Sequence, residues 1–195
     1  MGKGLFDLEH HFAFYGAYHS NPTNILIHML FVWPLFFTSL ILWHFTPPLF
    51  VLSLPLGLDL GLNFGFFLAL LYAFFYVLMD AKAGSLAGFL CILCWVGADL
   101  LAASAGFSLA WKVVVAAQLF CWAGQFIGHG VFEKRAPALL DNLSQAFLMA
   151  PFFVFLELLQ SFFGYEPYPG FQASVKAKIE ANRKEWQDSK QKKAS

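Results

Sequence analysis

Long apolar runs separated by short polar breaks dominate this chain. The pattern predicts about four transmembrane helices, at 24–45, 62–79, 86–105 and 111–127. Each is close to the ~20 apolar residues that cross a hydrocarbon layer. Asn21-Pro22 precedes the first run as a helix start, with Asn as the cap and Pro at the first helical position. The connection 49–61 is apolar but interrupted by Pro55, Gly57 and Asp59, which indicates a re-entrant or interfacial segment.

Three further elements flank these runs. Residues 5–18 place Leu5, Leu8, Phe12 and Tyr15 at helical spacing, which predicts an N-terminal amphipathic helix in the membrane interface. Residues 139–163 form a fifth apolar helix that Pro151 should kink, and we expect it to be re-entrant or interfacial. The charged run 176–193 is typical of a solvated helix or tail. The predicted fold is an all-α integral membrane protein, with one membrane-embedded catalytic domain at 1–170 and a charged cytosolic tail at 171–195.

Composition supports this interpretation. Of the 195 residues, 59% are hydrophobic and 12% are charged, whereas soluble domains carry about 25% charged residues. No Asp, Glu, Lys or Arg lies between Glu9 and Asp59. The net charge of zero argues against nucleic acid as a partner. The polar N-terminus lacks the features of a cleavable signal peptide, so we expect the first apolar run to stay as an anchor.

The distribution of cations predicts the topology. Positively charged loops face the cytosol, and Lys82 follows the second span while Lys134 and Arg135 follow the fourth. An even number of spans then places both ends of the chain in the cytosol. The fifth helix fits if it does not cross, because a fifth crossing would carry the basic tail into the lumen.

Three histidines meet at the cytosolic face under this topology. His19 precedes the first span, His28 lies about two turns inside it, and His129 lies at the end of the fourth span. Imidazole ligands suit iron, zinc, copper or nickel, and three of them leave coordination positions open. Glu133, four residues after His129, is a further ligand, an orienter of a histidine, or an ion-pair partner of its neighbours. Lys134 and Arg135 either dock an anionic headgroup or fatty-acid carboxylate or serve only as positive-inside anchors.

The stretches around these histidines resemble a known family. Tyr-x2-Tyr-His-x-Asn-Pro-x-Asn-x3-His begins at Tyr15, and Gln-Phe-x-Gly-His-Gly-x-Phe-Glu-Lys-Arg-x-Pro-Ala-Leu-x-Asp-Asn-Leu begins at Gln125. Both are similar to motifs of the fungal endoplasmic-reticulum 2-hydroxy fatty acid dioxygenases, which are related to the yeast enzyme of phytosphingosine breakdown. The resemblance extends from Gly4 to about Tyr165.

The resemblance implies an Fe(II)-dependent alpha-oxidation that shortens long-chain 2-hydroxy fatty acids by one carbon with O2. It implies an endoplasmic-reticulum location, a substrate drawn from membrane lipid, and His19, His28 and His129 as the motif histidines. His10, His11 and His44 fall outside the motifs, and we expect them at the surface or the membrane interface.

Other functions stay open at this point. A non-enzymatic lipid-binding or transport protein would need no metal. A di-iron hydroxylase needs histidine clusters that this chain lacks, and a haem protein would use paired axial histidines such as His28 and His129. Cys91 and Cys94 form a C-x-x-C, but they lie in an apolar run without a second pair, so we expect them to be buried packing residues.

Overall fold

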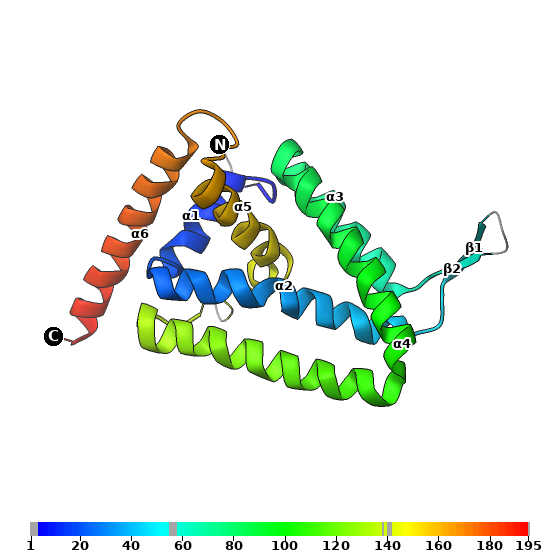
Figure 1. The fold of residues 1–195 in the computed structure, drawn as a ribbon. Coiled ribbons are helices and arrows are strands. Elements are labelled where there is room, and N and C mark those ends of the chain that lie inside the picture. The colour runs from blue at the N-terminus through cyan, green and yellow to red at the C-terminus, as the bar shows by residue number, and fades with distance from the viewer. Residues whose placement is uncertain (1–3, 55–57, 138, 140–141, 195) are drawn as a thin grey trace. The chain divides into compact units, whose positions relative to one another are not determined.

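The structure is a computed structural model, and it describes residues 4–54, 58–137, 139 and 142–194. Helices make up most of it (Figure 1). The α-helices are α1 (Leu8–Tyr18), α2 (Pro22–His44), α3 (Phe64–Met79), α4 (Ala81–Ile127), α5 (Ala150–Phe163) and α6 (Phe171–Ala194). Two π-helical turns are η2 (Gly128–Glu133) and η4 (Gln145–Met149). The prediction of an all-α fold is therefore confirmed, with one short hairpin added.

The hairpin occupies the connection between α2 and α3. Strands β1 (Phe50–Leu54) and β2 (Leu58–Leu62) pair antiparallel, with Phe50 opposite Leu62. A re-entrant or interfacial segment was expected here, partly because of Pro55 and Gly57, and both residues lie outside the described part of the chain. The side chains of β1 that the structure describes are exposed.

The chain divides into two compact units. Unit 1 comprises Met1–Met29 with Gln125–Ser195, and unit 2 comprises Leu30–Gly124. The boundaries fall inside α2 and α4, so the first turns of α2 and the last residues of α4 belong to unit 1.

Unit 2 contains most of the apolar helices. The Gln118 amide of α4 donates to the Leu35 carbonyl and to the hydroxyls of Thr38 and Ser39 on α2, at 2.9–3.1 Å. These bonds satisfy a polar side chain on an apolar helix. Gly106 interrupts α4 with φ 68° and ψ 161°, a conformation that favours glycine. The third and fourth predicted spans are thus two arms of one kinked helix.

Within the described residues, three helices are long and apolar enough to cross a membrane: Pro22–His44, Ala81–Glu133 and Gln145–Phe163. The predicted count of four spans is not confirmed. Phe64–Met79, the second predicted span, has 16 residues, below the ~20 usually needed. The fifth apolar helix, which we expected to be re-entrant or interfacial, reaches spanning length with 19 residues.

Unit 1 packs α5 and α6 against α1. The N-terminal helix begins later than predicted, at Leu8, where the Asp7 side chain accepts from the His10 backbone N–H. Its aromatic core includes Phe12, which contacts Phe153 of α5 and Phe171 of α6. The charged C-terminal run forms the predicted helix, and α6 lies beside α1 in Figure 1.

Pro151 stands at the start of α5, directly after the π-helical turn η4. Proline has no N–H to donate, so the regular hydrogen-bond ladder cannot continue through it. The expected irregularity at Pro151 thus takes the form of a π-helical turn that ends where α5 begins.

Candidate metal centre

Three histidines come from three different elements of unit 1. His19 is the C-cap residue of α1, His28 lies in the second turn of α2, and His129 lies in η2. All three are buried, with 4–8% of their surface exposed. A buried imidazole needs a polar partner or a ligand to offset the loss of water.

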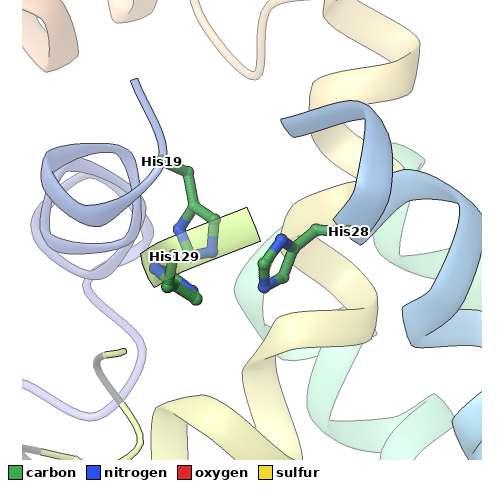
Figure 2. A group of neighbouring side chains, drawn as sticks. All are labelled: His19, His28 and His129. Atoms are coloured by element: carbon green, nitrogen blue, oxygen red, sulfur yellow. The ribbon is translucent and has the colours of Figure 1, made fainter. Parts of the chain in front are cut away.

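The three side chains lie next to one another (Figure 2), and each pair of rings meets edge to face. The ring centroids of His19 and His28 lie 4.3 Å apart, and the centroid of His129 lies 4.8 Å from each of those two. One ring nitrogen of each lies within 4.8 Å of one from both others. The predicted convergence of these three histidines is therefore seen in the structure.

Backbone carbonyls determine which nitrogen two of these rings present. His19 Nδ1 lies 2.8 Å from the Tyr15 carbonyl oxygen, and His28 Nδ1 lies 2.9 Å from that of Asn24. A carbonyl only accepts, so in each neutral ring the proton is on Nδ1 and the lone pair is on Nε2. Nε2 of His19 and Nδ1 of His129 are buried without a partner in the described part of the chain.

Burial also keeps His19 neutral. It lowers the pKa of His19 well below its ordinary value, and the neighbouring His28 and His129 lower it further. The Tyr15 ring stacks on His19, with centroids 4.1 Å apart and 20° between the planes. The neutral form is the one that binds metals.

Glu133 ties together the segments that carry the histidines. Its carboxylate accepts from the backbone N–H of Ser20 at 3.0 Å and of Asn21 at 2.9 Å, and from the Ser20 hydroxyl. It also accepts from the Asn24 amide at 3.3 Å. Ser20 follows His19, and the Asn24 carbonyl fixes His28, so these contacts favour the orienting role among the three considered for Glu133.

Gly128 allows η2 to approach α2 closely. A Cβ on Gly128 would lie 2.3 Å from Oδ1 of Asn24, and Asn24 is fully buried. The π-helical turn then places His129 directly after this contact. Such turns are rare and often occur at functional sites.

Lys134 and Arg135 have different surroundings. Lys134 is exposed and ends η2 in the left-handed conformation, with φ 55°. The Arg135 guanidinium donates to the Ala17 carbonyl at 2.7 Å and lies 3.6 Å from the centre of the Tyr18 ring. Arg135 thus already holds η2 against α1 through protein contacts.

The three-histidine group fits a metal ion. Nε2 of His19 and Nδ1 of His129 are buried without a partner among the described residues, and two Nδ1–H groups are held by backbone carbonyls, as is usual for metal-bound imidazoles. Three nitrogen donors suit iron and its neighbours in the first transition series and leave positions for other ligands.

The remaining histidines and the cysteines lie outside this group. His11 meets Gln145 at 2.8 Å, and His44 lies 2.5 Å from an Asp99 oxygen. Cys91 and Cys121 are buried and Cys94 is partly buried, all as free thiols, which agrees with the packing role predicted for them.

The fold and the site define a helical protein, apolar enough to enter a membrane, with a buried three-histidine centre. Residues 5–162 match the model of the family described as "2-hydroxy-palmitic acid dioxygenase Mpo1-like". The chain belongs to this family. It is 36% identical, over 92% of its length and 91% of the relative's, to the protein named 2-hydroxy-palmitic acid dioxygenase MPO1 from Saccharomyces cerevisiae. No solved structure matches the chain.

Family membership confirms the resemblance seen in the two histidine motifs and the prediction of an enzyme class. Sequence reasoning missed Tyr15, Ser20 and Asn24 as supports of the site. A signal was present, because Tyr15 and Asn24 each lie four residues before a motif histidine, the spacing at which a helix places a carbonyl beneath a side chain.

Proposed function

We propose that this protein is an Fe(II)-dependent dioxygenase that converts long-chain 2-hydroxy fatty acids into fatty acids one carbon shorter. The observation that carries the proposal is the convergence of three buried histidines from separate segments. The yeast relative of this chain is named a 2-hydroxy-palmitic acid dioxygenase. The proposed ligands are His19, His28 and His129.

The reaction balances without a further co-substrate. R–CH(OH)–COOH and O2 give R–COOH, CO2 and H2O, with the 2-hydroxy acid supplying the electrons and the lost carbon leaving as CO2. An iron ion in the site would bring the substrate oxygens and O2 together. The protein binds and orients, with neutral imidazoles held by the Tyr15 and Asn24 carbonyls.

In this proposal Glu133 is a positioning residue. It holds the Ser20–Asn21 turn and Asn24, and so fixes His19 and His28 relative to His129. Lys134 and Arg135 were considered either as contacts of the substrate carboxylate or as positive-inside anchors. The contacts of Arg135 with Ala17 and Tyr18 support a structural role for its guanidinium, which leaves Lys134 as the freer cation of the two.

We further propose that the protein is a multi-pass component of the endoplasmic-reticulum membrane with its site facing the cytosol. The apolar helices support a membrane location. The positive-inside rule, applied to Lys82, Lys134 and Arg135, supports the orientation. A substrate entering from the cytosolic leaflet would keep its acyl chain in the bilayer.

Iron analysis and turnover of the detergent-purified protein test this proposal. We expect about one Fe(II) bound per three-histidine site and O2-dependent conversion of 2-hydroxypalmitate to pentadecanoate. Alanine in place of His19, His28 or His129 should abolish both metal retention and turnover while leaving the helical circular-dichroism signal, with His44→Ala as the matched control. A wild-type protein that binds the lipid but retains no metal and turns nothing over would be a lipid-binding or transport protein instead.

A further inference from the structure

A pocket in unit 1 reaches His19 from the side of α6. It lies among α1, α5 and α6 and has a volume of about 340 Å³. His19 is one of its lining residues, so the pocket adjoins the three-histidine group. It is therefore a space in which a small polar group can lie next to His19.

The pocket lining includes polar side chains, one of them without a partner. The Gln160 amide nitrogen is buried without a hydrogen-bond partner in the described part of the chain, and the Tyr15 side chain lies beside the Glu157 carboxyl group. Tyr15 is 5% exposed. Buried donors of this kind are normally satisfied by water or a ligand.

One cation and one anion also line the pocket. Lys176 of α6 is its one Lys or Arg among the described residues, and Glu157 of α5 is its one carboxylate. The ion pairs that the structure shows within the described ranges are His44–Asp99 and Lys178–Glu9, and neither involves these two side chains. Lys176 therefore has no anionic partner among the described residues, whereas Glu157 contacts the Tyr15 side chain.

We propose that this pocket binds the head of the 2-hydroxy acid, with Lys176 donating to the carboxylate and Glu157 accepting from the 2-hydroxyl group. The assignment rests on the proposed function. It names Lys176, rather than Lys134 or Arg135, as the carboxylate contact, because Lys176 lines a pocket that reaches His19.

The two charges together match this substrate better than an ordinary fatty acid. The Glu157 carboxyl group needs a donor when it is charged, and an ordinary fatty acid has none to offer beside its carboxylate. A 2-hydroxy acid presents a donor on the carbon next to its carboxylate, so it can satisfy both side chains at once. Charge-assisted bonds of this kind are about twice as strong as neutral ones, and their loss costs about tenfold or more in affinity.

Binding and kinetics with 2-hydroxypalmitate and palmitate test the assignment. We expect Lys176→Gln to weaken 2-hydroxypalmitate binding about tenfold and to raise KM far more than it lowers kcat. Lys176→Arg should restore most of the affinity. Glu157→Gln should reduce the preference for 2-hydroxypalmitate over palmitate. Lys184→Gln, an exposed lysine of α6 outside the pocket lining, is the matched control.

The outcomes separate this inference from the proposed function. If wild type binds 2-hydroxypalmitate without iron or turnover and Lys176→Gln loses that binding, the proposed function fails and the pocket assignment stands. If wild type is active and Lys176→Gln matches Lys184→Gln in both Kd and KM, the assignment is overturned. A raised KM in Lys134→Gln with an unchanged Lys176→Gln would overturn it in favour of Lys134.

Discussion

One backbone carbonyl determines the protonated nitrogen in each of the rings of His19 and His28. Each ring donates from Nδ1 to the carbonyl four residues earlier, so each presents an unprotonated Nε2. The carbonyl belongs to the same helical segment as the histidine, and the orientation of the ring is therefore set locally. The relative placement of the rings must come from longer-range contacts, and Glu133 and Gly128 supply them.

Changing Glu133 to Gln should weaken metal binding and leave the ligands themselves intact. The amide has one acceptor oxygen, and its NH2 group would face the N–H groups of Ser20 and Asn21. We expect metal affinity to fall by about 10–100-fold, as for other residues that orient ligands, and turnover to recover at saturating Fe(II). Metal titration checks this, with Glu185→Gln on the exposed side of α6 as the control. Complete loss of metal at any concentration would instead make Glu133 a ligand.

Replacing Gly128 with Ala should push η2 away from α2. The new Cβ would lie 2.3 Å from Asn24 Oδ1, whereas a Cβ at Gly130 meets nothing within 4 Å. Overpacking of this kind costs about 1–3 kcal/mol of unfolding free energy, and we expect metal affinity to fall with it. Gly130→Ala, in the same turn, is the control and should leave both unchanged. Equal thermal stability and iron content in the two variants would show that the close contact is unimportant.

At the scale of elements, Glu9 connects α1 to the C-terminal helix. Its carboxylate pairs with Lys178 and accepts from Ser174 and from Tyr168, just before α6. The bonds to Lys178, Ser174 and Tyr168, in that order, lower the pKa of Glu9 from 4.5 to about 2. The charged form is thus favoured by the contact with α6.

This shift predicts an acid-sensitive attachment of α6. Because the pKa is lower in the folded state, the stabilisation is complete above about pH 4.5 and is lost as pH falls toward 2. Hydrogen exchange of α6 should show protection at pH 7 that declines below pH 4.5. Glu9→Gln should show reduced protection already at pH 7 and a smaller acid step. An identical pH profile in wild type and Glu9→Gln would contradict the role of Glu9.

The elements also show what the sequence allowed us to predict. The helix start at Asn21-Pro22 follows from local chemistry, and the structure contains it. The C-terminal run, predicted as a solvated helix or tail, is the helix α6. Pro151, predicted to kink the fifth apolar helix, stands at the start of α5 after a π-helical turn. The hairpin at Phe50–Leu62 was missed, because an apolar run with glycine and proline has no clear period of two. The third and fourth predicted spans are both part of α4, which continues on both sides of Gly106. Composition alone does not reveal the backbone conformation at Gly106, so this connection was not predicted.

The grouping of the three histidines was predicted from the sequence, whereas the side chains that support them were not. Charge-based topology brought His19, His28 and His129 to one membrane face, and the structure gathers them. Which residues touch Glu133 depends on the register of η2 against the first turn of α2, a tertiary relation. Lys176 was treated as part of a charged tail, because nothing local in the sequence shows that α6 packs on α1.

At the scale of the whole molecule, the orientation in the membrane decides how substrate reaches the histidines. The proposed orientation puts Lys82, Lys134 and Arg135 in the cytosol, as the positive-inside rule favours, together with the ends of the elements that carry the site. Under that proposal the connection that contains β1 is expected in the lumen. The length of α5 would permit it to cross the membrane, and a crossing would put α6 in the lumen against the positive-inside rule. The proposed pocket includes residues of α6. The side of the membrane on which α6 lies therefore also tests the pocket.

Single cysteines in a background lacking Cys91, Cys94 and Cys121 can report these sides in sealed microsomes. Exposed positions near the site, on α6 and on β1 are Ala136, Ser189 and Ser53. We expect an impermeant maleimide to label cysteines at Ala136 and Ser189 from outside, and one at Ser53 only after detergent is added. Protection of Ala136 would place the metal centre in the lumen and contradict the orientation. Protection of Ser189 alone would make α5 a true span and would put α6 on the opposite side from η2, which is incompatible with the Arg135–Asn182 contact at 3.5 Å.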